Sequence, residues 1–335
     1  MTKMDYDLYN TREISAFPPF PAAPLTGTPP RKDRFRVHLL ALGDVGSTLA
    51  MGLRLLGGDV ISALGICDLR EGVLQRWEFE LNQINIPGEG RFPPVEIVDM
   101  DHILDCDVFL FCASRFVPDT AVKSGDVRMA QYALNRPLVA GYARMARKKG
   151  FQGMFCVVSD PVDQLCRAAL TESNRDEAGQ PDGKGLRPGQ IRGFGLGVMN
   201  ARAMYFAQKD PRFASYLTEG RAFGPHGEGL IIANSIARYD DKLSRELTEL
   251  TKGANLQMRA WGYKPYAAPA LSSGALSLLA CLRGEWQYSS VFLDGIYFGV
   301  RNRLTPDGCE VEQLDIPGPL AERIRETAAL LKGIE

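Results

Sequence analysis

The sequence has few of the residues from which several kinds of site are built. Its 335 residues include only three histidines and seven cysteines, and no two cysteines stand in a CxxC pair. An odd number of cysteines, mostly inside apolar runs, predicts reduced thiols in the core and argues against a disulfide framework or a zinc site. These cysteines are Cys67, Cys106, Cys112, Cys156, Cys166, Cys281 and Cys309.

Excess charge and long hydrophobic runs are also missing. Lysine and arginine total 39 against 40 acidic residues, a net charge of -1, which gives no electrostatic reason to expect a nucleic acid or an anionic membrane as partner. No apolar run reaches the roughly 18 residues of a membrane span, and the N-terminal region lacks the apolar core of a secretory signal. We therefore expect a soluble, cytoplasmic protein without a membrane or nucleic-acid partner.

What the chain does have is enough apolar sequence for a large core. With 45% hydrophobic residues it predicts about two domains. Residues 1–33 are rich in proline and aromatic residues, and form either an arm that docks on the body or on a neighbouring subunit, or a disordered tail. The polar stretch 172–190 is the clearest change of composition. It predicts a linker or insertion between a first, NAD-binding domain at 34–171 and a second, catalytic domain at 191–335.

A strand, a tight turn and a helix follow the arm. The turn contains Gly43-Asp44-Val45-Gly46, the arrangement of a dinucleotide-binding loop in which Ala41 stands where a first glycine is usual. Gly43 would let the backbone approach a pyrophosphate, and Gly46 would let the helix pack on the strand. The N-terminus of the helix would attract the phosphates.

The second apolar run ends in an acidic residue. Asp68 follows Gly43 by 25 residues, where a carboxylate can accept hydrogen bonds from an adenosine ribose. The same carboxylate would repel a 2′-phosphate. The pattern therefore favours NAD over NADP as cofactor.

Strand-like and helix-like stretches then alternate along the chain. Apolar runs at 108–112 and 154–158 are typical of strands buried on both faces of a parallel sheet. The sequence therefore predicts a Rossmann-type, doubly wound α/β sheet followed by an α+β substrate domain. Ligands of such sheets bind at the carboxyl ends of the strands, here near Gly43, Ala113 and Ser159.

One histidine, His226, lies in the glycine-rich turn Phe223–Gly229. An imidazole titrates near neutrality and can give and take a proton, and flanking glycines keep bulk away from it. Considered alone, the turn is better explained by a histidine that fills a surface loop. Together with a dinucleotide loop it indicates hydride chemistry, in which a nicotinamide carries the hydride and the histidine carries the proton.

The order and spacing of these motifs resemble the lactate/malate dehydrogenase family from about Arg36 to the C-terminus. Residues 41–46 are similar to the family's cofactor loop, residues 159–163 (Ser-Asp-Pro-Val-Asp) to its S-N-P-V-D strand end, and residues 224–228 to its G-x-H-G turn. The resemblance implies an NAD-dependent oxidoreductase that transfers a hydride between nicotinamide and a small 2-hydroxy or 2-oxo carboxylic acid. It also implies a homodimer or homotetramer.

The resemblance assigns roles to single residues. It implies that His226 carries the proton, that Arg202 clamps the substrate carboxylate, and that Arg128, on a mobile lid, meets the polarised carbonyl. Asn135 would lie beside the nicotinamide. Val122 would stand at the lid position that separates lactate-like from malate-like substrates, and a valine there argues against a dicarboxylic acid.

The two arginines also fit ordinary structural roles. Apart from the spacing, Arg128 is equally well explained as a surface helix residue, and Arg202 as one half of a buried ion pair. A second carboxylate on the substrate also has possible partners, because Lys123 or Arg115 could swing toward it from a lid about five residues longer than usual.

Two departures from the family pattern affect the chemistry. Where the family holds its histidine with an aspartate, this chain has Met199, and loss of such a carboxylate can cost about 10⁴ in rate. Where the family has asparagine, this chain has Asp160. A carboxylate there repels an anionic substrate unless it is protonated or paired. As an alternative, Asp160 becomes the new partner of His226, which requires its carboxylate to lie within about 5 Å of the ring.

Three functions stay open. The first is an NAD-dependent 2-hydroxy acid dehydrogenase whose substrate has an apolar or unusual side chain. The second is an NAD-binding sensor or partner-binding protein with catalysis impaired by Met199. The third is an oxidoreductase of altered substrate that does not need the aspartate. The substitution Met199→Asp would raise the reduction of pyruvate or oxaloacetate under the first and do little under the third.

Overall fold

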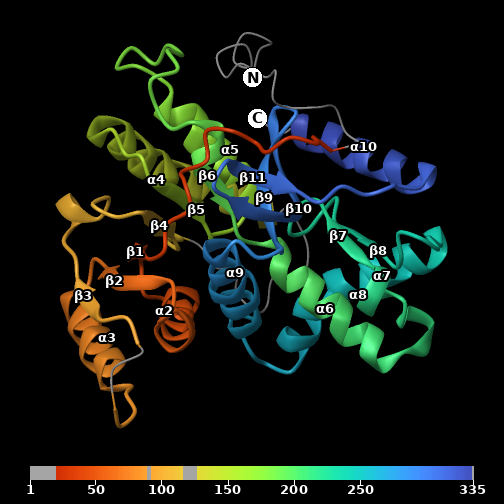
Figure 1. Ribbon diagram of the computed structural model, residues 1–335, viewed down its shortest axis with the longest axis horizontal. Coiled ribbons are helices and arrows are strands. Elements are labelled where there is room, and N and C mark those ends of the chain that lie inside the picture. The colour runs from red at the N-terminus through yellow and green to blue at the C-terminus, as the bar shows by residue number, and fades with distance from the viewer. Residues whose placement is uncertain (1–19, 89–91, 116–126, 334–335) are drawn as a thin grey trace.

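The computed structural model describes residues 20–88, 92–115 and 127–333, without the side chains of residues 127 and 128. Within them, the centre is a nine-stranded sheet in the order β11-β10-β9-β6-β5-β4-β1-β2-β3, with helices on both faces (Figure 1). Most of the N-terminal arm and Val122 lie outside the described residues, as does the side chain of Arg128.

Six strands of this sheet are parallel. Their order, 3-2-1-4-5-6, confirms the predicted doubly wound sheet. Because β6 pairs with β5, the sheet continues across the predicted domain boundary at residue 190. The elements of this part are β1 (Phe35–Leu40), α2 (Asp44–Leu56), β2 (Ile61–Cys67), α3 (Glu71–Gln83), β3 (Val95–Ile97), η2 (Met100–His102), β4 (Val108–Phe111), α4 (Val127–Lys149), β5 (Met154–Val157), α5 (Val162–Ser173), η3 (Pro188–Gln190) and β6 (Ile191–Gly193).

The central strands are apolar on both faces because each face carries helices. In β4, Val108 and Leu110 join the core formed with α2 and α3, whereas Phe109 and Phe111 join the core formed with α4 and α5. All four side chains are fully buried. The continuous apolar run at 108–112 therefore follows from the two-residue period of a strand covered on both sides.

The second half of the chain adds an antiparallel extension and a helical layer. Strands β9, β10 and β11 join the sheet beside β6, and β7 pairs with β8 in a separate two-stranded sheet. The elements are α6 (Leu196–Lys209), η4 (Pro211–Phe213), α7 (Tyr216–Glu219), β7 (Arg221–Phe223), β8 (Ile231–Ala233), α8 (Asp241–Ala260), η5 (Pro269–Leu276), α9 (Ser277–Arg283), β9 (Gln287–Leu293), β10 (Ile296–Thr305), β11 (Gly308–Val311) and α10 (Gly318–Lys332).

Two helices of the second half begin in different ways. Helix α8 begins at Asp241, because the Asp240 side chain accepts a hydrogen bond from the Leu243 amide and caps the helix there. Helix α9 instead continues directly from the π-helical segment η5.

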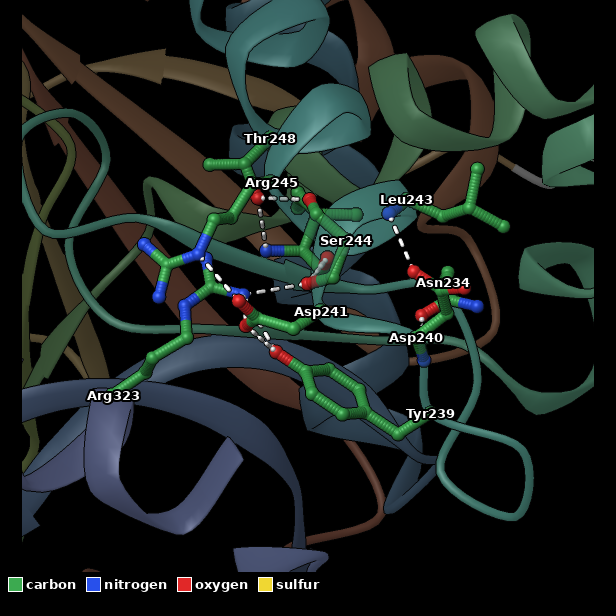
Figure 2. A network of polar contacts seen from close by, with 10 residues as sticks. Asn234, Tyr239, Asp240, Asp241, Leu243, Ser244, Arg245, Thr248 and Arg323 are labelled. Atoms are coloured by element: carbon green, nitrogen blue, oxygen red, sulfur yellow. Dashed lines mark hydrogen bonds and ion pairs between the residues drawn. The ribbon is translucent and has the colours of Figure 1, made fainter. Parts of the chain in front are cut away.

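A buried polar network joins α10 to the start of α8 (Figure 2). Arg323 is 8% exposed, and its Nη1 donates to the Tyr239 hydroxyl and to Ser244 Oγ, each at 2.7 Å. Asp241 Oδ1 lies 3.5 Å from the same nitrogen. A buried guanidinium is stabilised only when such acceptors surround it, so this network fixes α10 against α8.

The described end of the N-terminal arm docks on the body. Phe20 is buried and stacks on Phe223, with the ring centroids 6.0 Å apart. Leu25 is buried too, and it exchanges backbone hydrogen bonds with Cys309 of β11. Of the described residues, none belongs to a helix long and apolar enough to cross a membrane. All seven cysteines are free thiols.

Candidate active site

A cavity of about 470 Å³ opens at the carboxyl ends of β1, β4 and β5. Three stretches that the sequence singled out meet in its wall: the glycine turn, the end of β5 and the histidine turn. The end of α8 and the loop that follows it complete the wall. The predicted site residues that line the cavity are Gly43, Asp44, Val45, Gly46, Asp68, Ser159, Asp160 and His226.

The glycine turn has the shape that a dinucleotide loop requires. Ala41 adopts a φ of 75°, the left-handed conformation for which a glycine is usual, and its methyl group is accommodated. A Cβ at Gly46 would lie 1.9 Å from the Ala41 carbonyl oxygen, so α2 can approach β1 only through a glycine. A Cβ at Gly43 would meet no protein atom within 4 Å. The open space there lies at the N-terminus of α2, and helix N-termini are common positions for bound phosphates in proteins.

Asp68 ends β2 at the edge of the cavity, where the sequence predicts the ribose carboxylate. The Leu42 amide donates to its Oδ2 at 2.8 Å, and Arg70 donates to its Oδ1 from both the amide and Nε at 3.1 Å. Burial opposes ionisation of this carboxyl, but the hydrogen bonds from Arg70 and Leu42 outweigh it and lower its pKa. Asp68 is therefore an ionised acceptor that already has a cationic partner.

The strand end and the histidine turn converge. His226 Nδ1 lies 3.1 Å from Asp160 Oδ1, within the distance of about 5 Å that the alternative role of Asp160 as the partner of His226 requires. The imidazole is 8% exposed and the carboxylate 38% exposed. Gly195 packs under the histidine, because a Cβ there would lie 3.0 Å from the His226 Cβ. The arrangement is a carboxylate–imidazole pair in the wall of a cavity.

Asn135 supports this wall from behind. It is fully buried in α4, and its Nδ2 donates to the Asp160 carbonyl at 2.9 Å, while its Oδ1 accepts from the Arg115 amide at 2.9 Å. Ser159 Oγ donates to the Ala113 carbonyl at 2.8 Å. Neither Asn135 nor Ala113 lines the cavity. They connect the ends of β4 and β5 and so position Asp160.

Arg202 lies in α6 and is not among the residues that line the cavity. Its Nη2 donates to Asn255 Oδ1, and Asn255 lines the cavity. Its Nη1 lies 3.6 Å from the sulfur of Met199. Met199 is 1% exposed and belongs to the apolar cluster under α6. The side chain that replaces the expected aspartate thus packs as a core residue.

Sequence reasoning missed several polar residues of the wall, including Arg70, Asn255, Arg259 and Lys264. Asn255 and Arg259 come from α8, Lys264 lies 3.3 Å from Asp44 across the mouth of the cavity, and Arg70 follows β2. Nothing local distinguishes Asn255 and Arg259 from the other polar residues of an amphipathic helix. Only the fold brings them to the glycine turn.

Thiol and metal chemistry have little support at this cavity. Cys112 lines it, and burial raises the pKa of this thiol to about 12, so the thiol is protonated at neutral pH. In the described part of the chain, no three histidine, cysteine or acidic side chains are grouped as metal ligands. The pair formed by Asp160 and His226 is the one in the cavity wall that contains a histidine.

Comparison with known proteins relates the chain to one enzyme family. No family model matches it. An L-lactate dehydrogenase of Treponema denticola is 27% identical over 203 residues, which are 60% of this chain and 58% of that enzyme, less than two thirds of its length. A malate dehydrogenase of Aliarcobacter butzleri is 22% identical over 298 residues, 82% of this chain and 87% of that protein.

Solved structures agree in fold. The minor L-lactate dehydrogenase of Enterococcus mundtii, in a ligand-bound form, matches 90% of this chain and 97% of its own with a TM-score of 0.69 and 21% identity. The malate dehydrogenase of Archaeoglobus fulgidus in complex with NADH matches 89% and 97% with a TM-score of 0.66 and 18% identity. The chain is thus similar, at low identity, to curated lactate and malate dehydrogenases, and it shares the fold of solved ones.

Proposed function

We propose that this protein is an NAD-dependent oxidoreductase that transfers a hydride between nicotinamide and a small 2-hydroxy or 2-oxo carboxylic acid. One observation carries the proposal. An aspartate–histidine pair, Asp160 and His226, lies in the wall of the same cavity as a glycine turn fitted for a dinucleotide. Its relatives are named lactate and malate dehydrogenases, in agreement with this chemistry.

The pair provides the proton that the reaction requires. The Nδ1 atom of His226 faces Asp160, so the ring donates that N–H to the carboxylate and uses Nε2 to exchange a proton with the substrate oxygen. The carboxylate of Asp160 fixes the tautomer and stabilises the imidazolium. When bound, the nicotinamide supplies or accepts the hydride at the carbinol carbon.

The substrate carboxylate is assigned to Arg202. Asn255 holds one end of its guanidinium and keeps it close to the wall of the cavity. A planar guanidinium binds a carboxylate through two parallel hydrogen bonds, and such binding fixes the orientation of the carbonyl next to it. Arg128, in the first turn of α4, is proposed to meet the substrate carbonyl, and Val122 to favour a substrate without a second carboxylate.

The aspartate–histidine pair favours an enzyme over a sensor with impaired catalysis. The sensor hypothesis rests on Met199, which leaves His226 without the usual aspartate. Asp160 supplies a carboxylate to the same imidazole at 3.1 Å, so the loss at Met199 is compensated from the end of β5. We further propose that the enzyme is a cytoplasmic homodimer or homotetramer.

A substrate screen tests the proposed function. The purified protein is mixed with NADH and with each of a panel of 2-oxo acids with apolar, polar and acidic side chains, and NADH is followed by its absorbance. We expect NADH oxidation with at least one monocarboxylic 2-oxo acid, and slower oxidation with oxaloacetate. Tight NADH binding with no turnover on any 2-oxo acid would favour the sensor instead.

A further inference from the structure

The part of the cavity at the end of β2, where Asp68 is expected to meet the adenosine ribose, contains an arginine that the cofactor prediction did not include. Arg70 lines the cavity two residues after Asp68, and its side chain is 66% exposed while that of Asp68 is 7% exposed. The sequence-based preference for NAD assumed an uncompensated carboxylate at this position. The structure shows an ion pair instead.

Both oxygens of Asp68 are fully used by this pair and by the backbone. Oδ1 accepts from the Arg70 amide and Nε at 3.1 Å, and Oδ2 accepts from the Leu42 amide at 2.8 Å and from Arg70 Nη2 at 3.4 Å. The two backbone donors are fixed by the turn. A ribose diol can bind Asp68 only if the guanidinium of Arg70 gives way, which weakens the usual advantage of NAD.

The outer edge of the guanidinium is available to an anion. A guanidinium has five N–H groups, of which Nε and one on Nη2 point to Asp68. The others belong to a side chain that is mostly exposed at the cavity. The pair also carries no net charge, so it lacks the repulsion that a lone aspartate exerts on a phosphate. Arginine is the side chain best suited to bind a phosphate through two hydrogen bonds.

We propose that Arg70 holds the adenosine 2′-phosphate of NADP(H) on its outer edge, so that the cavity takes NADP(H) as well as NAD(H). This inference rests on the proposed function, because it needs a dinucleotide in the cavity. Arg70 thereby determines cofactor selectivity: it competes with the ribose of NAD for Asp68 and supplies the cation that the 2′-phosphate of NADP requires.

Calorimetric titration of the full-length protein with NADPH and NADH, in the absence of substrate, tests the proposal. We expect the wild-type protein to bind NADPH within about tenfold of its affinity for NADH. Arg70→Ala should weaken NADPH binding by about tenfold or more, since a charge-assisted contact is lost, and should leave NADH binding equal or tighter, since the ribose then has no competitor for Asp68. Arg76→Ala is the matched control, because Arg76 is an exposed residue of α3 outside the cavity and pairs with Glu80. It should change neither affinity.

Three results would overturn the proposal. The first is a wild-type protein that binds NADH but binds NADPH more than about a hundredfold more weakly. The second is an equal loss of both affinities in Arg70→Ala, which would make Arg70 a general support of the loop. The third is binding of neither cofactor. In that case the proposed dehydrogenase function fails as well, whereas the first two results contradict the role of Arg70 and leave the dehydrogenase in place.

Discussion

Two polar clusters of this chain differ in burial: one lies between helices, and the other lies in the wall of the cavity. Arg323 is buried between α8 and α10 and donates to several oxygen acceptors, and none of these residues lines the cavity (Figure 2). The pair formed by Asp160 and His226 lies in the cavity wall, and its carboxylate is 38% exposed. A closed network holds helices together, whereas an open pair keeps a titratable group within reach of a ligand. Substitutions in the two clusters should therefore affect different properties.

The largest expected effect is on catalysis, in Asp160→Asn. We expect kcat to fall by about 10²–10⁴-fold, because the amide no longer stabilises the imidazolium or fixes its tautomer. The melting temperature should change little. The family's aspartate corresponds to Met199 in this sequence, so the double variant Asp160→Asn/Met199→Asp should recover part of the rate. Steady-state kinetics with the best 2-oxo acid gives kcat for the single variant and for the double variant. An unchanged kcat in Asp160→Asn would show that Asp160 is not the partner that matters.

The second effect is on stability, in Arg323→Met. Removal of the guanidinium leaves buried oxygens without their donor, and we expect the free energy of unfolding to fall by about 2–4 kcal/mol. The rate per folded molecule should stay the same. Arg325→Ala is the control, since its exposed pair with Glu322 contributes at most about 0.5 kcal/mol. Denaturant unfolding gives the free energy of unfolding of both variants. A loss of activity without a loss of stability in Arg323→Met would contradict a purely structural role for the Arg323 network.

The same division applies within the glycine turn. In Gly46→Ala the new methyl group meets the Ala41 carbonyl, and we expect a loss of about 1–3 kcal/mol in stability. In Gly43→Ala the methyl group meets no protein atom and the backbone, at φ of -72°, accepts alanine, so stability should change by less than about 0.5 kcal/mol. The affinity for NADH should nevertheless fall by about tenfold or more, because the methyl group enters the space of the pyrophosphate. Equal NADH affinity in Gly43→Ala and the wild type would place the cofactor elsewhere.

The smallest effect concerns a buried histidine outside the site. Desolvation lowers the pKa of His38 in the folded protein, although its Nδ1 hydrogen-bonds the Ile103 carbonyl at 3.0 Å. The unfolded chain therefore binds a proton more readily, and this contribution to stability is complete above the unfolded pKa and decreases as the pH falls below about 6.5. In His38→Gln, the free energy of unfolding should depend less on pH: between pH 6.5 and 5 its slope should be smaller by up to about 1.4 kcal/mol per pH unit. Denaturant unfolding curves measured at several pH values in this range test the prediction. It is contradicted if the free energy of unfolding has the same pH slope in His38→Gln and in the wild type.

The parts of the fold that the sequence predicts are those set by local pattern. Apolar runs such as 108–112 mark strands covered on both faces, and the turn around Gly43 and Gly46 marks the start of a helix at a strand end. The strands β7 and β8 have three residues each, too few to show a period, and they were not predicted.

The residues of the site also differ in whether a local pattern predicts them. His226 and Asp160 were predicted from motifs, but their contact was only an alternative, because no local pattern shows whether a strand end and a turn 66 residues apart converge. Arg70 and Asn255 were missed, because their position depends on packing between distant elements and no local pattern records it.

The most direct test of the central claim is rapid mixing of the NADH-loaded protein with its best 2-oxo acid, in the wild type and in His226→Ala. NADH affinity is measured alongside by calorimetry. The account predicts that His226→Ala binds NADH as the wild type does and oxidises it at least about a hundredfold more slowly, because the substrate oxygen lacks its proton donor. Equal rates in the two proteins would show that the imidazole in the cavity wall does not carry the proton.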